Sequence, residues 1–164
     1  MVPDQPTNFM ELLRSLKLAG VEFIVIGGVA GSAHGAARAT YDLDVLYSRA
    51  SENLDRLIAA IAPLNPYPRG APPGLPFNWD RRSIDFGLNF TLKTSAGFID
   101  LLGEIAGGTY DQLLPHTTRI NVFDIDCLCL DLATLIRTKR AAGRPKDSEA
   151  IAELELIESQ RKRS

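Results

Sequence analysis

The sequence predicts an α/β (α+β) fold, with a mixed sheet of about five strands flanked by helices and further helices at the C-terminal end. Short β-rich runs alternate with segments whose apolar residues recur at helical spacing. Of the 164 residues, 45% are hydrophobic and 23% are charged, which is the balance of a globular protein with a core. A chain of this length suits one domain, so we expect residues 1–164 to form one domain with a helical segment over about 131–160.

The first half of the chain shows the alternation most clearly. Phe9, Leu12, Leu13 and Leu16 recur at helical spacing. A short apolar run then ends at a pair of glycines, which is typical of a buried strand followed by a tight turn. The predicted elements are a helix from residue 9 that Thr7 or Asn8 caps and Gly20 ends, a strand at 21–26, a short helix at 29–37, a strand at 41–47 and a helix that begins near Ser51 or Glu52.

Residues 63–76 contain 6 prolines, and this density predicts a loop. Two interpretations remain open for this loop: a mobile cover over a site, or an ordered crossing of the surface. Beyond it, the predicted elements are strands at 84–92 and 98–102, a short helix at 110–114, one or two strands within 119–130, a helix at 131–142, a break at Gly143 and a last helix from 146 to about 159.

The charge and cysteine content narrow the function classes. The formal net charge of -2 gives no global basic field of the kind that nucleic acid demands. Cys127 and Cys129 are two residues apart in an apolar run without nearby histidines, so we expect buried, reduced thiols and no zinc site. No signal peptide is recognisable, and no apolar run approaches the roughly 20 residues of a membrane helix. We therefore expect a cytoplasmic protein.

Gly27 and Gly28 stand between the first predicted strand and a helix. Glycine lets the backbone approach a ligand closely, and free N–H groups at the start of a helix favour phosphate. Glycine pairs at such turns are also common for packing reasons alone. The pair therefore becomes informative only together with the carboxylates that follow it.

Asp42 and Asp44 lie two residues apart on a predicted strand. The period of a strand places both on one face, roughly 6.5 Å apart along the chain, while Leu43 and Val45 face the core. Two adjacent carboxylates repel unless a cation or a proton intervenes, and their oxygens suit Mg²⁺. The alternative is a half-exposed edge strand. The glycine turn just upstream favours the metal-binding hypothesis.

A third carboxylate is needed for a site with two metal ions. Asp100 is the best candidate, because it is a lone acid in an apolar strand, where an unpaired charge is costly. Asp85 is its rival. A second Asp-x-Asp pair, Asp124 and Asp126, has no glycine turn before it, and we interpret it as part of a turn or a strand end.

Lys139 continues the apolar stripe of the helix at 131–142, and Asp147 extends the stripe of the last helix backwards. Two interpretations remain open: a salt bridge between these two residues, or a lysine that reaches a triphosphate or a transition state. His34 and His116 are isolated, and a structural role is the simpler interpretation for His34.

Together these residues resemble the nucleotidyltransferase superfamily, which includes the minimal nucleotidyltransferases and AbiEii-type toxins. The resemblance covers roughly residues 20–160. The residues that carry it are Gly27-Gly28, His34-Gly35, Arg38, residues 40–44, Asp100 and residues 135–147. Many members have Gly-Ser where this chain has Gly27-Gly28, and Ser32 is the serine that lies four residues on.

The resemblance implies transfer of a nucleoside monophosphate from a nucleoside triphosphate to a hydroxyl acceptor. Asp42, Asp44 and Asp100 would hold Mg²⁺ or Mn²⁺, two ions about 3.5–4 Å apart, and Asp100 would help to deprotonate the acceptor. Arg38 and Lys139 would neutralise developing charge. Gly27, Gly28, Arg38 and Ser32 form the expected nucleotide-binding set.

The acceptor and partner remain open at this stage. RNA, a protein or a small molecule is each compatible with the sequence, and the resemblance to toxins adds an antitoxin protein as a candidate partner. The alternative function is a non-catalytic module on the same fold that binds a nucleotide or a protein.

Overall fold

The computed structural model of the chain describes residues 5–164 and contains a seven-stranded mixed sheet. Its strands are β1 (Phe23–Ile26), β2 (Asp42–Tyr47), β3 (Tyr67–Pro68), β4 (Asn89–Thr94), β5 (Gly97–Leu102), β8 (Thr117–Val122) and β9 (Ile125–Leu130). They are arranged in the order β3-β4-β5-β2-β1-β9-β8. The predicted mixed sheet with flanking helices is confirmed, with seven strands rather than about five. A separate pair of two-residue strands consists of β6 (Glu104–Ile105) and β7 (Gly108–Thr109).

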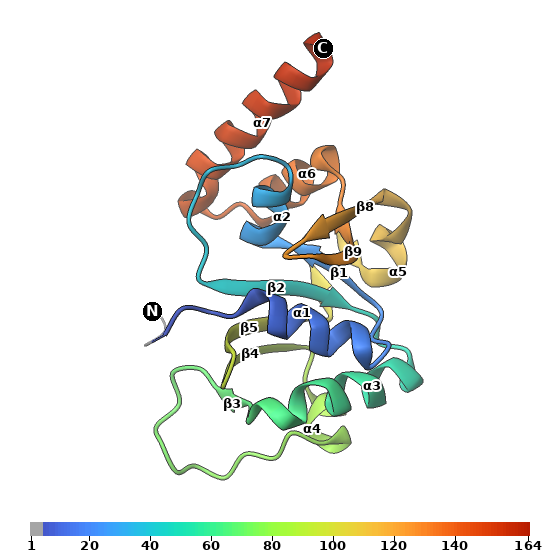
Figure 1. Cartoon of the computed structure of the whole chain (residues 1–164), viewed down its shortest axis with the longest axis vertical. Coiled ribbons are helices and arrows are strands. Elements are labelled where there is room, and N and C mark those ends of the chain that lie inside the picture. Colours follow the sequence, from blue (N-terminus) through green and yellow to red (C-terminus); the bar gives the residue numbers. More distant parts are fainter. Residues whose placement is uncertain (1–4) are drawn as a thin grey trace.

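Seven α-helices flank the sheet within the described residues. They are α1 (Phe9–Leu18), α2 (Gly27–Ala33), α3 (Ser51–Ile61), α4 (Arg81–Phe86), α5 (Tyr110–Leu113), α6 (Leu132–Ala142) and α7 (Ser148–Arg163). In Figure 1, α1 runs along the sheet with α3 and α4 below it, while α2 and α6 lie above β2 and α7 extends away from the rest of the chain. Across residues 5–164, every helix is too short or too polar to cross a lipid bilayer.

Local signals explain where several helices begin and end. The Asn8 side chain accepts a hydrogen bond from the Glu11 N–H at the start of α1, and Asp131 does the same for Thr134 at the start of α6. Gly143, with φ +65°, ends α6 in the left-handed conformation. Asn8 is thus the residue that caps the first helix. The expectation that no signal peptide is present depends in part on residues 1–4, which lie outside the described range.

The strand predicted at 84–92 is wrong over its first part. Asp80 accepts a hydrogen bond from the Ser83 N–H and starts α4, which continues to Phe86. The strand β4 begins only at Asn89, after Gly87. The cap at Asp80 therefore decides the local structure, against the apolar pattern that suggested a strand. Ile84 is fully buried, but it lies on a helix instead of a strand.

The helix predicted at 29–37 begins and ends earlier than expected. The observed helix α2 starts at Gly27 and ends at Ala33, and His34 follows as its C-terminal cap. Gly35 has φ +110°, a conformation that takes the chain out of the helix. The glycine pair therefore forms the first turn of the helix rather than a linker before it.

The cysteines on the last strand and the histidine that contacts the last helix were both the subject of predictions. Cys127 and Cys129 lie buried on β9 as free thiols, and burial raises the pKa of Cys127 to about 11 and that of Cys129 to about 12. The basic residues at 161–163 are exposed and form the last turn of α7. Arg161 donates to the His34 carbonyl oxygen at 2.9 Å and lies 3.2 Å from His34 Nδ1, which supports a structural role for that histidine.

Candidate active site

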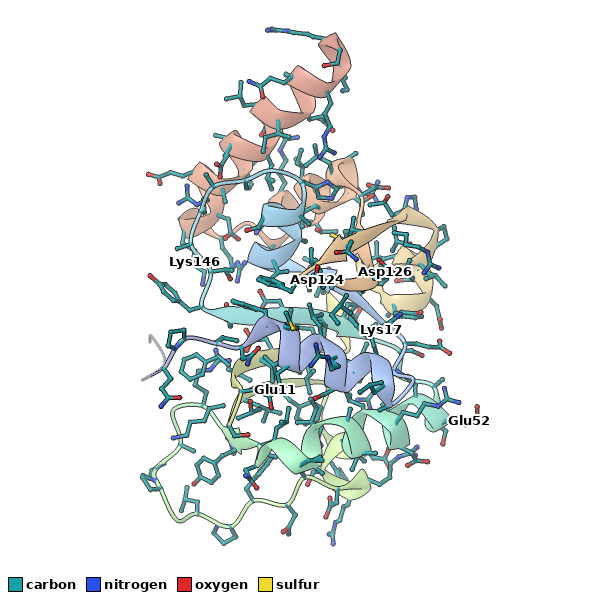
Figure 2. The ribbon with its side chains drawn as sticks, in the orientation of Figure 1. Glu11, Lys17, Glu52, Asp124, Asp126 and Lys146 are labelled. Carbon is teal, nitrogen blue, oxygen red and sulfur yellow. The ribbon has the colours of Figure 1, made fainter. Side chains whose placement is uncertain are left out.

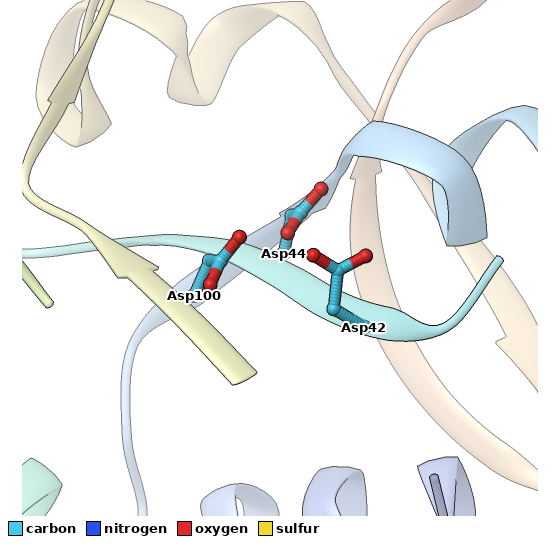
Figure 3. A group of neighbouring side chains, drawn as sticks. All are labelled: Asp42, Asp44 and Asp100. Carbon is cyan, nitrogen blue, oxygen red and sulfur yellow. The ribbon is translucent and has the colours of Figure 1, made fainter. Parts of the chain in front are cut away.

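The candidate site lies where β2 and β5 run side by side. The two strands are parallel, and their register places Asp44 directly beside Asp100 and Asp42 beside Phe98. Because neighbouring residues in register project to the same face, the three carboxylates converge, as Figure 3 shows. One oxygen from each of Asp42, Asp44 and Asp100 lies within 4.8 Å of the other two. This is the only group of three or more such acidic or metal-ligating side chains within residues 5–164.

The convergence has an electrostatic cost that falls mainly on Asp44. Burial, followed by the charges of Asp42 and Asp100, raises the pKa of Asp44 to about 8, and the charge of Lys139 acts in the opposite direction. Burial and Asp100 also raise the pKa of Asp42, against the effect of Arg69. Asp44 Oδ1 is buried and has no hydrogen-bond partner. A buried, unpartnered carboxylate oxygen is costly, so the arrangement favours a bound cation or a proton.

Gly27 and Gly28 come close to these side chains. A Cβ atom at Gly27 would lie 2.1 Å from Asp44 Oδ2, and Gly27 has φ +67°. A Cβ atom at Gly28 would lie 2.7 Å from the Thr40 hydroxyl oxygen. A side chain at Gly27 would push into the carboxylate site, so this glycine is required for the backbone to approach it, whereas Gly28 leaves room for the Thr40 side chain.

A cavity of about 370 Å³ opens onto Asp44 and Asp100. It is bordered by Gly27 and by Lys139, which reaches it from α6. Of the two interpretations of Lys139, the salt bridge with Asp147 is not formed, because Asp147 pairs instead with Arg144 at 2.7 Å. Further lining residues with polar side chains are Asn89, Glu104, Thr138 and Arg144.

Two residues of the predicted nucleotide-binding set lie elsewhere. Arg38 is exposed and pairs with Glu149 at 3.2 Å, away from the residues that line the carboxylate cavity. Ser32 borders a different cavity of about 320 Å³, together with Thr40 and Phe123. The structure therefore brings together Gly27, the three aspartates and Lys139, but not Arg38 or Ser32.

The other acidic candidates are outside the group. Asp85 is exposed on α4 and pairs with Arg81 at 2.9 Å. Asp124 and Asp126, labelled in Figure 2, are exposed on the β8–β9 hairpin, and Asp126 accepts a hydrogen bond from Asn121. The interpretation of this second pair as a turn and strand end is confirmed.

One residue of the site was not anticipated from the sequence. Arg69 follows β3, and its guanidinium lies 2.8 Å from Asp100 Oδ1 and 3.6 Å from Asp42 Oδ2. A signal did exist, because Arg69 is the only charged residue within the proline-rich stretch 63–76. A lone cation in an apolar, proline-rich segment needs a partner if it is buried.

Comparison with known proteins agrees with the fold. No protein-family model matches the chain, and no curated protein matches its sequence. Among the solved structures that it resembles is that of a proposed nucleotidyltransferase from Thermotoga maritima, with a TM-score of 0.56 and 12% sequence identity. The match covers 87% of this chain and 86% of the other. The chain therefore has a nucleotidyltransferase-like fold.

Proposed function

We propose that this chain is a metal-dependent nucleotidyltransferase, which moves a nucleoside monophosphate from a nucleoside triphosphate to a hydroxyl acceptor. The observation that carries the proposal is the group of three converging carboxylates, of which Asp44 has a buried oxygen without a partner. Carboxylate oxygens at this spacing suit Mg²⁺ or Mn²⁺, with substrate phosphates completing the coordination. The nucleotidyltransferase-like fold supports the same conclusion.

The donor set fits a divalent ion well. Asp42, Asp44 and Asp100 would hold it, and no nitrogen or sulfur ligand competes among the group. A bound ion would supply positive charge for the phosphate oxygens of the substrate and lower the pKa of the acceptor hydroxyl. Lys139 would add positive charge from α6, which also lines the cavity, and Gly27 with Gly28 would let phosphate approach the backbone.

The reaction balances as a substitution at phosphorus. The acceptor oxygen forms a bond to the α-phosphorus, the bond from that phosphorus to the bridging oxygen of the β-phosphate breaks, and pyrophosphate leaves. Asp100 would accept the proton of the acceptor hydroxyl. Asp100 lies on the wall of the cavity, where an acceptor could reach it.

The acceptor and the biological setting are finer parts of the proposal. An acceptor hydroxyl on RNA, a protein or a small molecule fits the reaction. The resemblance to AbiEii-type toxins favours a toxin whose partner is an antitoxin protein, working in the cytoplasm, where nucleoside triphosphates are abundant. A neighbouring antitoxin gene would support this setting.

A second candidate function is a non-catalytic module that binds a nucleotide or a protein. The observation that favours it is Arg69, which already neutralises part of the acidic group without a metal ion. Such a module would bind nucleotide without turnover, or would bind no nucleotide.

Isothermal titration of the four nucleoside triphosphates, with and without Mg²⁺, tests the proposal. The wild type is expected to bind one or more of them only with Mg²⁺, and the double variant Asp42→Asn with Asp44→Asn is expected to lose this binding. The matched control is Asp124→Asn with Asp126→Asn, which removes the same pattern from the hairpin. Metal-independent binding, or equal binding by both double variants, would contradict the proposal.

A further inference from the structure

Arg69 enters the acidic group from the edge of the sheet. Its backbone N–H donates to the Thr91 carbonyl oxygen at 2.9 Å, which extends the pairing of β3 with β4 by one residue. From there its guanidinium reaches across to Asp100 at 2.8 Å and to Asp42 at 3.6 Å. The cation is therefore attached to the frame of the sheet and spans two of the three carboxylates.

Several further contacts hold the guanidinium in place. Nη2 also donates to the Leu92 carbonyl oxygen at 3.0 Å, and the guanidinium carbon lies 4.2 Å from the centre of the Phe98 ring. The side chain is 13% exposed. Displacing the cation would break these contacts and leave two carboxylates without their counter-ion, which is expensive in a partly buried site.

The positive charge is distributed unevenly over the group. Asp42 and Asp100 share Arg69, whereas Asp44 has no ion pair within residues 5–164 and keeps one buried oxygen without a partner among them. Asp44 and Asp100 both line the cavity that Gly27 and Lys139 border, and of these two carboxylates only Asp100 is paired with Arg69. One side of the group is thus filled by a guanidinium, and the Asp44 side is open to a cation.

We infer that Arg69 replaces one of two divalent ions, so that the site binds a single ion on the Asp44 side. The inference rests on the proposed function. A guanidinium keeps its charge at any relevant pH, and its fork matches two carboxylates. Two divalent ions beside a fixed cation in a poorly solvated site would repel one another strongly. Arg69 acts as a positioning residue, which holds Asp42 and Asp100 in place and supplies the charge of the missing ion.

Counting bound Mn²⁺ by electron paramagnetic resonance tests this inference, with a non-hydrolysable nucleoside triphosphate analogue at saturation. The wild type is expected to bind one Mn²⁺ per chain. Arg69→Ala vacates the second position and is expected to bind two. Arg69→Lys keeps a positive charge and is expected to bind one.

The matched control is Arg49→Ala. Arg49 also contacts an aromatic ring, at 5.8 Å from the centre of Tyr47, and donates to a backbone carbonyl oxygen, that of Ile84. Its removal is expected to leave the count at one, because Arg49 lies outside the acidic group. A lower melting temperature without a change in count would show only a structural role for the arginine that was removed.

Each outcome decides the inference. Two Mn²⁺ ions in the wild type overturn it, even if Arg69→Ala does not fold, while transfer activity of the same protein, assayed separately with a hydrolysable nucleoside triphosphate, keeps the proposed function. One ion in folded Arg69→Ala also overturns it. Binding of neither Mn²⁺ nor the analogue by the wild type overturns the proposed function, and the inference with it.

Discussion

The chain contains two Asp-x-Asp pairs, and they lie in very different surroundings. Asp42 and Asp44 lie half-buried on β2, where Asp44 stands beside Asp100 in the register of β5. Asp124 and Asp126 are exposed on a hairpin, where Asp124 has φ +63° in the turn. The same local pattern thus gives a charged, poorly solvated group in one place and a solvated turn in the other. The neighbouring strand, rather than the motif, makes the difference.

The sharpest test of this comparison is transfer activity in the two double variants. Asp42→Asn with Asp44→Asn is expected to lower the turnover rate at least about 10³-fold, because the loss of a metal site costs several kcal/mol. Asp124→Asn with Asp126→Asn is expected to stay within about twofold of the wild type. Radiolabelled nucleotide transfer, with circular dichroism to check the fold, measures both. Equal losses in the two variants would remove the distinction between the pairs.

The third carboxylate gives the next largest effect. Asp100→Asn is expected to lower the turnover rate about 10²-fold, since it weakens both metal binding and proton acceptance. Asp85→Asn removes only an exposed ion pair with Arg81 and is expected to change stability by less than about 1 kcal/mol. Initial rates and melting curves of both variants check the assignment. A normal rate in Asp100→Asn would contradict the assignment of Asp100 as the third ligand.

Substitutions of two neighbouring basic residues on α6 test whether positive charge at the cavity contributes to turnover. Lys139→Ala is expected to lower turnover about 10-fold to 30-fold, because it removes charge that faces the triphosphate. Arg140→Ala removes an exposed partner of Glu155 and is expected to leave the rate unchanged. A comparison of rates with melting temperatures separates the two roles. A loss of stability without a loss of rate in Lys139→Ala would indicate a purely structural lysine.

The smallest expected effect is on the pH dependence of stability without metal. The pKa of Asp44 is raised to about 8 from an ordinary value of 3.8. Between about pH 4 and pH 8, the Asp44 carboxyl is protonated in the folded state and ionised in the unfolded state. This difference makes the free energy of unfolding fall as pH rises through that window. Above about pH 8 its effect is constant.

Asp44→Asn cannot ionise, so it is expected to flatten this decline and to raise the free energy of unfolding near pH 8. Chemical denaturation in EDTA at several pH values measures the change. Asp126→Asn is the control and is expected to retain the wild-type slope. Saturating Mg²⁺ is expected to flatten the slope of the wild type as well, because the ion competes with the proton. An unchanged slope in Asp44→Asn would contradict the proposed electrostatics.

Much of the fold follows from local signals. The strand β2, the cap of α1 at Asn8 and the end of α6 at Gly143 agree with expectations from period and capping. The strand predicted at 84–92 failed because the cap at Asp80 starts a helix there. The two apolar residues that suggested a strand, Ile84 and Phe86, do not distinguish the two periods over so short a run.

The sequence by itself determined the alternation of strands and helices and the placement of Asp42 and Asp44 on one face of a strand. These features depend on side-chain period and backbone freedom, which are local properties. Only the tertiary structure decided that Asp44 pairs with Asp100, that Arg38 faces away and that Arg69 fills one side of the site. Such contacts depend on strand register and on the course of a proline-rich loop, which the packing of the whole sheet sets.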